Sequence, residues 1–266
     1  MPLSTAAAPQ ASHEEGIAVE GDVVSVQPAG VAKVVARLTQ SSLGLKALVA
    51  VTGLGLVAFA FVHMAGHLQM FALLGGQEGY NQYAHKLQSL GALKWAARAG
   101  LLALTLVHVI ATLKLIARNR SARPIGYASN HWLTASVASQ TMRVTGPILL
   151  FFIIYHLLHF TALVVSAQGY EAMEYMLRDG SNLVVGDAYG RMVQAFRDPL
   201  LTVVYVLAVG LLGVHLAHGI SSLFQTLGLT NSTYRPALAT AGPLLAGLLT
   251  AGFAVVPLAI LTGVIQ

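Results

Sequence analysis

Residues 47–71 read ALVAVTGLGLVAFAFVHMAGHLQMF. An α-helix needs roughly 20 apolar residues to cross a bilayer, and this stretch exceeds that length without an Asp, Glu, Lys or Arg. Two histidines, His63 and His67, nevertheless lie four residues apart near its end. A polar side chain inside a span is costly, and it usually faces the bundle interior, where it serves a site. The stretch therefore predicts a membrane helix that contributes to a buried site.

The composition extends this prediction to the whole chain. Of the 266 residues, 56% are hydrophobic and 9% are charged, which is outside the range of ordinary soluble domains. Backbone polar groups in lipid must be satisfied within the segment, and long runs of leucine, alanine and glycine favour helices over barrel strands. The expected fold class is all-α, an integral membrane bundle of five transmembrane helices near residues 45–73, 95–117, 143–166, 199–224 and 238–264.

Polar segments divide the chain. Residues 1–30 are rich in small and polar residues and lack the basic start and apolar core of a secretory signal, so we expect a flexible N-terminal extension. Residues 31–266 then form the transmembrane domain. Gly75-Gly76 is expected to end the first span, ARPIGY (122–127) to separate the second from the third, and Asp198-Pro199 to start the fourth.

Two connectors are candidates for short surface helices. The segment VAKVVARLTQ (31–40) places Lys33 and Arg37 four apart on one face, which is typical of an amphipathic helix on a membrane surface. Residues 170–178 are the second candidate. An ordinary solvated connector is the alternative for both segments.

The basic residues predict the orientation, because cytoplasmic loops keep an excess of Lys and Arg. They flank the start of the first span and fill the connector between the second and third spans, which has no acidic residue: Lys33, Arg37, Lys46, Lys114, Arg118, Arg120, Arg123 and Arg143. The next connector is mixed in charge. We expect a bacterial-type cytoplasmic membrane, with the N-terminus in the cytoplasm and the C-terminus outside. Basic patches interleaved with exposed aromatic residues are missing, so no nucleic-acid partner is expected.

Histidines occur in four of the five expected spans, as His63 with His67, His108, His156 with His159, and His215 with His218. At 1.5 Å rise per residue, His63 and His156 lie roughly 20 to 25 Å beyond the basic residues that precede their spans. His108 and His215 lie toward the opposite, inner face. The chain thus offers an outer pair, His63/His156, and an inner pair, His108/His215, which is the requirement of two stacked haems, each clamped between imidazoles of two helices.

Other interpretations stay open at this point. A zinc site needs three or four ligands at one depth, usually with a carboxylate or a cysteine, but the spans contain no Asp or Glu and the chain contains no cysteine. The missing cysteine also excludes iron–sulfur clusters held by this chain. A histidine-lined membrane transporter or ion carrier without a redox role is the rival from another class. A cytochrome b that anchors a different dehydrogenase is a third possibility.

Either member of each histidine doublet could face inward, because the two residues are one turn apart. We take the first member as the iron ligand. The second members, His67, His159 and His218, are then expected at the haem edge, bonded to a propionate or a water. A partly hydrated interfacial histidine is the alternative for each of them.

Five stretches together resemble the single-chain, five-helix, di-haem cytochrome b anchor of succinate dehydrogenases and quinol:fumarate reductases. They are ALVAVTGLGLVAFAFVHMAGHLQMF, EGYNQYAHKLQSLG, ARPIGY, SQTMRVTGPILLFFIIYHLLHF and VYVLAVGLLGVHLAHGISSLFQTLG, within residues 40 to 230. The resemblance implies axial haem ligands at His63, His108, His156 and His215, paired first with third and second with fourth. It further implies two haem b groups, menaquinone, the lipid bilayer, a flavoprotein partner with FAD and an iron–sulfur partner.

The resemblance also defines what this chain does and does not contribute. The dicarboxylate reaction belongs to the flavoprotein, so this chain alone is not the catalyst and contributes the quinone site. Glu78 and His85 in the first outer connector are the candidates for the quinone region. Some relatives have a glutamate two residues before the fourth-span ligand, whereas Gly213 stands here, which argues against proton transfer by that route.

Overall fold

Five long helices make up most of the protein, for which a computed structural model describes residues 30–122 and 136–266. They are α2 (Ser42–Leu68), α4 (Ala92–Ser121), α5 (Val137–Phe160), α7 (Pro199–Thr226) and α8 (Arg235–Leu261). Each is long and apolar enough to cross a membrane. The expected all-α bundle of five membrane helices is confirmed. The N-terminal extension and most of the ARPIGY stretch lie outside the described residues.

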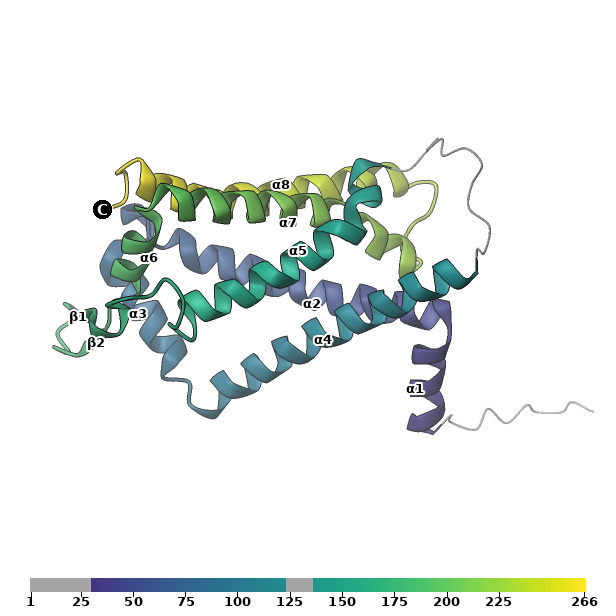
Figure 1. The fold of residues 1–266 in the computed structure, drawn as a ribbon, viewed down its shortest axis with the longest axis horizontal. Helices are drawn as coiled ribbons and strands as arrows, with labels where there is room; N and C mark the ends of the chain where they lie inside the picture. The colour runs from purple at the N-terminus through teal and green to yellow at the C-terminus, as the bar shows by residue number, and fades with distance from the viewer. Residues whose placement is uncertain (1–29, 123–135) are drawn as a thin grey trace, which may run out of the picture.

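Successive long helices run in opposite directions (Figure 1). Helix α7 packs against α8 and α5, and α2 packs against α4 and α7. Helix α1 (Val31–Gln40) lies at one end of the bundle, which we call the α1 end. The opposite end, called the α6 end, carries α3 (Gly76–Gln88), α6 (Ala188–Phe196), the short 3-10 helices η1 (Ala72–Leu74) and η2 (Tyr170–Ala172), and strands β1 (Glu174–Met176) and β2 (Val184–Gly186).

The boundaries of two helices differ from the sequence-based expectation. Helix α2 ends at Leu68, not at Gly75-Gly76, because the chain turns there and buries Met70 in the core at the α6 end. The two glycines instead join η1 to α3 with positive φ angles of 144° and 62°. Helix α5 starts and ends six residues before the expected 143–166, since Ser136 caps its first turn. The start of α7 at Pro199 is as expected, with Asp198 as its cap.

The two candidate surface helices have different outcomes. Residues 31–40 do form a helix, α1, which runs across the direction of the bundle (Figure 1). A side chain at Gly44 of α2 would touch the backbone of Leu38, so α1 packs tightly on the start of α2. The helical interpretation of 170–178 is wrong, because η2 is followed by β1, which pairs antiparallel with β2.

A buried polar contact fixes the connectors at the α6 end. Asn81 of α3 is fully buried and donates a 2.8 Å hydrogen bond to Oδ1 of Asp187. Its own side-chain oxygen accepts from the backbone N–H of Tyr189 at 3.0 Å. Asp187 also accepts from the N–H of Gly190 and so caps α6. The connector after α2 and the connector before α7 are therefore held together as one layer over the bundle.

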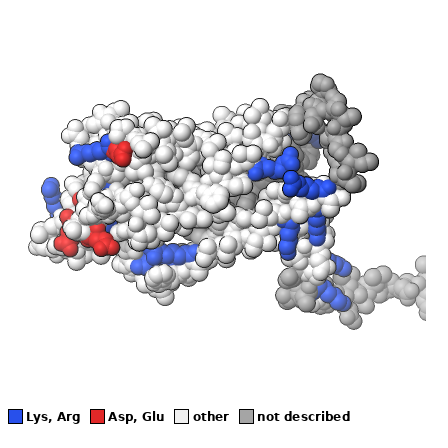
Figure 2. Space-filling view, viewed as in Figure 1, with Lys and Arg blue, Asp and Glu red and all other residues white. Residues whose placement is uncertain are grey.

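The two ends of the bundle differ in charge: Lys and Arg occur at both, whereas Asp and Glu gather at one (Figure 2). All acidic residues that the structure describes lie in connectors at the α6 end: Glu78, Glu171, Glu174, Asp179, Asp187 and Asp198. In the described part of the α1 end, all charged residues are basic. They lie on α1, at the start of α2, at the end of α4, on α5 and at the start of α8.

Candidate functional site

The outer pair lies between α2 and α5, near the α6 end. The ring centroids of His63 and His156 are 5.9 Å apart, and the ring planes are inclined by 76°. Aromatic rings surround both: Phe253 of α8 lies 5.9 Å from His63, and Tyr205 of α7 lies 6.0 Å from His156. Side chains from four of the five spans thus converge on one level of the bundle.

One nitrogen of this pair has no protein partner. Nδ1 of His156 is buried, and no group among the described residues forms a hydrogen bond with it. A buried polar atom left unpaired costs about 1–3 kcal/mol, so such atoms often mark a site completed by something other than protein. The outer pair is therefore not satisfied by the protein side chains alone.

Tyrosines engage the second histidine of two doublets. Nδ1 of His67 lies 2.9 Å from the hydroxyl of Tyr80, and its Nε2 lies 3.2 Å from Nε2 of His63. His159 is fully buried and has a tyrosine hydroxyl at each ring nitrogen, Tyr205 at 2.9 Å and Tyr170 at 3.3 Å. In the doublet of α5, the second member is thus engaged on both sides while the first has a free nitrogen.

The inner pair comes from α4 and α7, and each of its histidines meets a threonine of a different helix. Nδ1 of His108 lies 3.1 Å from Oγ1 of Thr52 on α2. Nδ1 of His215 lies 3.2 Å from Oγ1 of Thr145 on α5.

The two pairs lie at different levels. Thr52 precedes His63 by eleven positions on α2, and Thr145 precedes His156 by eleven positions on α5. Eleven residues of helix make about three turns and about 16 Å. Since the inner histidines contact these threonines, the inner pair lies about this distance closer to the α1 end. The structure therefore places the rings of His63 and His156 side by side, and it places His108 and His215 at a second level nearer the α1 end.

The sequence reasoning did not find Thr52 and Thr145. Each belongs to the same tripeptide, VTG, at 51–53 and 144–146. The tripeptide occurs on two spans, and in both its threonine stands eleven positions before a histidine, His63 or His156. This repetition was the signal that could have revealed the two threonines. His218, the remaining doublet member, lies half-buried on α7, one turn from His215 toward the α1 end.

The other expected residues lie at the α6 end. The carboxylate of Glu78 accepts hydrogen bonds from the Tyr175 hydroxyl at 2.9 Å and from the Arg178 N–H at 3.0 Å, so it holds the β1–β2 hairpin on α3. Burial, followed by the hydrogen bond to Glu78, raises the pKa of Tyr175. His85 lies half-buried two turns farther along α3.

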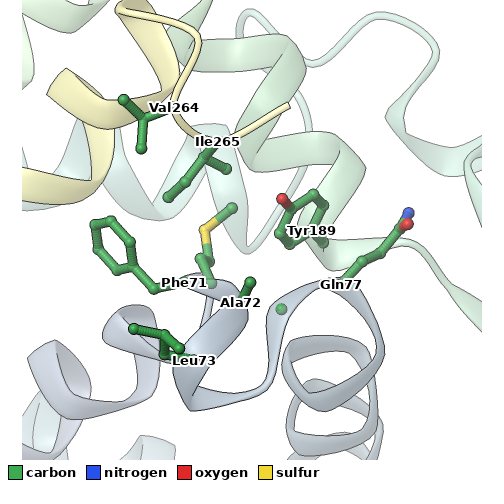
Figure 3. A pocket seen from close by; sticks show the side chains of 9 residues that line it. Phe71, Ala72, Leu73, Gln77, Tyr189, Val264 and Ile265 are labelled. Carbon is green, nitrogen blue, oxygen red and sulfur yellow. The ribbon is translucent and has the colours of Figure 1, made fainter.

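A pocket of about 340 Å³ opens at the same end, between the end of α2, the start of α3, α6 and the C-terminal tail. Figure 3 shows apolar side chains around it and Gln77 and Tyr189 to one side. Its lining residues are Met70, Phe71, Ala72, Leu73, Gly76, Gln77, Tyr189, Val264 and Ile265. Neither Glu78 nor His85 is among them, although Glu78 directly follows Gln77.

A zinc-type cluster does not form in the part of the chain that the structure describes. There, no group of three or more His, Cys, Asp or Glu side chains is arranged to hold a metal ion. The histidines of the spans are distributed over two levels instead.

Five membrane helices with histidines at two levels define the class, a multi-pass membrane protein with internal histidine sites. The family model described as succinate dehydrogenase/fumarate reductase transmembrane subunit matches residues 118–255, slightly more than half of the chain. The chain belongs to this family, as its sequence resemblance indicated. The matched stretch contains His156 and His215, whereas His63 and His108 precede it. Comparison with curated proteins and with solved structures gives no match.

Proposed function

We propose that this chain is the cytochrome b anchor of a succinate:quinone oxidoreductase. In this proposal it holds two b haems, the outer between His63 and His156 and the inner between His108 and His215. Electrons pass between an iron–sulfur partner and a quinone, in the direction of succinate oxidation or of fumarate reduction. Family membership supports the enzyme class, and the two histidine pairs at two levels carry the assignment of the haems.

The residues of the outer pair fit a haem. Histidine nitrogens bind metals at about 2 Å, so His63 and His156 would be close enough to hold one metal ion between their rings. The rings of His63 and His156 are 5.9 Å apart. The unpaired Nδ1 of His156 supports a non-protein occupant as well. If His63 bound the metal through Nε2, the ring of His67 would have to move away from that atom, which it now contacts.

The protein's own residues orient and insulate these sites. The imidazoles hold their positions through neighbouring helices, His108 through Thr52 and His215 through Thr145. The aromatic rings around the outer pair exclude water and lower the local dielectric. When bound, the haems supply one-electron redox chemistry, and their potentials depend on axial ligands, hydrogen bonds and burial.

The partners follow from the same assignment. A flavoprotein with FAD carries the dicarboxylate chemistry, and an iron–sulfur protein docks at the α1 end, which is basic in the described residues. The excess of basic residues supports a cytoplasmic location for that end, with the α6 end outside.

Menaquinone is proposed as the quinone, at the α6 end near the outer haem. The apolar pocket with Gln77 and Tyr189 lies at that end, and its volume is at the lower limit of ordinary ligand sites. Glu78 and His85 lie on α3 at the same end. The proposed quinone region is therefore this end of the protein.

Affinity purification of this chain from mild detergent tests the proposed assembly. The expected result is copurification of a protein with covalent flavin and an iron–sulfur protein, together with succinate-dependent quinone reduction. A transporter would purify alone and colourless. A cytochrome b that anchors another dehydrogenase would copurify with partners that do not oxidise succinate.

A further inference from the structure

We propose that the VTG tripeptides at 51–53 and 144–146 are matched sockets that fix the tautomer and ring orientation of His108 and His215. Thr52 and Thr145 are then positioning residues for the inner haem. This inference rests on the proposed function, because it concerns how this chain presents two nitrogens to iron.

The hydrogen-bond geometry fixes the tautomer. The Thr52 hydroxyl donates to the backbone carbonyl of Leu48 at 2.6 Å, and that of Thr145 donates to the carbonyl of Thr141 at 3.2 Å. A hydroxyl has one hydrogen, and a carbonyl only accepts. While the hydroxyl hydrogen stays on the carbonyl, the threonine oxygen is left to accept a hydrogen from Nδ1–H of its histidine. Nε2 of both histidines then lacks a hydrogen, which is the form that ligates a metal.

The sockets are closed to water, so the contacts are not replaced by solvent. Thr52 is 5% exposed and Thr145 is 3% exposed. A buried N–H that donates to a fixed oxygen holds the imidazole ring in one orientation and raises its basicity as a ligand.

The glycine of the first tripeptide leaves space for the edge of a histidine ring. A Cβ at Gly53 would lie 3.3 Å from Cε1 of His108, which is tighter than most side-chain contacts. A Cβ at Gly146 would lie 3.9 Å from Cε1 of His215, which is ordinary contact. The ring of His108 thus lies directly on the α2 backbone, and that of His215 lies close to α5.

The repeated arrangement distinguishes a socket from ordinary helix chemistry. Threonines in membrane helices often bond a carbonyl of the preceding turn, and Thr105 and Thr112 of α4 do so. The two VTG threonines differ in that each also has a histidine ring nitrogen within hydrogen-bond distance. They do so from two helices, each at eleven positions before an outer histidine.

Redox titration of the purified complex tests this inference. In Thr52→Val and in Thr145→Val, which keep the shape and lose the hydroxyl, the midpoint potential of the inner haem should rise, because its ligand becomes less basic. Its low-spin electron paramagnetic resonance signal should shift as the ring turns, while the outer haem keeps its potential. Thr52→Ser should restore both properties. Thr105→Val is the matched control, since it removes a hydroxyl of α4 bonded only to its own helix.

The inner haem is identified as the one missing from His108→Ala. Loss of that haem from Thr52→Val with retention in Thr52→Ser also supports the socket. Unchanged potential and resonance signal in both valine variants overturn it, and so does an equal change in Thr52→Ser. A wild-type complex without b haem overturns the proposed function, whereas two haems with unchanged inner properties overturn the socket alone.

Discussion

The hydroxyl of Tyr205 on α7 lies 2.9 Å from Nδ1 of His159 on α5. The hydroxyl of Tyr170 occupies the other ring nitrogen at 3.3 Å, and the side chain is fully buried. His159 therefore links α5 to α7 and to the connector at the α6 end. Its neighbour His156, one turn earlier, has a buried nitrogen without a partner among the described residues. The two histidines of this doublet have different environments and should respond differently to substitution.

Replacing His156 by alanine should remove the outer haem and leave the inner one, because the inner ligands belong to α4 and α7. Replacing His159 by alanine should leave both haems in place and lower the thermal stability, since two buried tyrosine hydroxyls lose a partner. Haem content per chain and thermal unfolding of the complex measure both effects. Loss of both haems from His156→Ala, or loss of a haem from His159→Ala, contradicts the pairing.

Replacing Asn81 by alanine should destabilise the layer at the α6 end. The side chain is fully buried and bonds both Asp187 and the N–H of Tyr189. Buried groups left unpaired cost about 1–3 kcal/mol each, and more for charged groups. Hydrogen exchange over residues 170–198 should accelerate. Gln88→Ala at the exposed end of α3 is the control, and equal exchange in the two variants contradicts the role of Asn81.

Alkaline pH should loosen the same layer. Burial raises the pKa of Tyr170 to about 12, with the neighbouring Tyr155 as the lesser cause, whereas an unfolded tyrosine titrates near about 10. A raised pKa in the folded state gives stability that is complete below about pH 10 and is lost as the pH rises to about 12. The melting temperature should fall across this window, and less so in Tyr170→Phe. The exposed Tyr234 gives the control variant Tyr234→Phe, and an identical pH profile in all three proteins counts against this account.

Replacing Gly213 by alanine should separate α7 from α8. A Cβ at this position would lie closer to Oγ1 of Thr250 than van der Waals contact allows, and overpacking of this kind costs about 1–3 kcal/mol. Thr250→Ala in the same chain should restore part of the lost stability, as measured by thermal unfolding. An unchanged melting temperature in Gly213→Ala would contradict this prediction, because it would mean that α7 and α8 accommodate the added methyl group. The close approach also explains why a glutamate has no room at this position.

The sequence predicts the helices well because length and apolarity alone decide them. The depth of His63, His108, His156 and His215 followed from the rise of a helix, and it anticipated that the rings of His63 and His156 approach each other. Segments between the spans were predicted less well. Residues 170–178 form a 3-10 turn followed by a strand and no amphipathic helix, and Glu78, about 100 positions earlier, holds this segment through Tyr175 and Arg178.

The end of α2 and the roles of Thr52 and Thr145 could be recognised only in the three-dimensional structure. Helix α2 ends early because Met70 enters a core built from α6, α7 and α8, which the local sequence does not reveal. Thr52 and Thr145 were missed since a threonine in an apolar span usually bonds its own helix. Their contacts with histidines of other helices exist only in the assembled bundle.

Quantitation of haem in the purified wild-type complex tests the central claim most directly. A reduced-minus-oxidised spectrum with pyridine haemochrome analysis should give two b haems per copy of this chain, one for each histidine pair. A folded complex with a featureless spectrum would contradict the account.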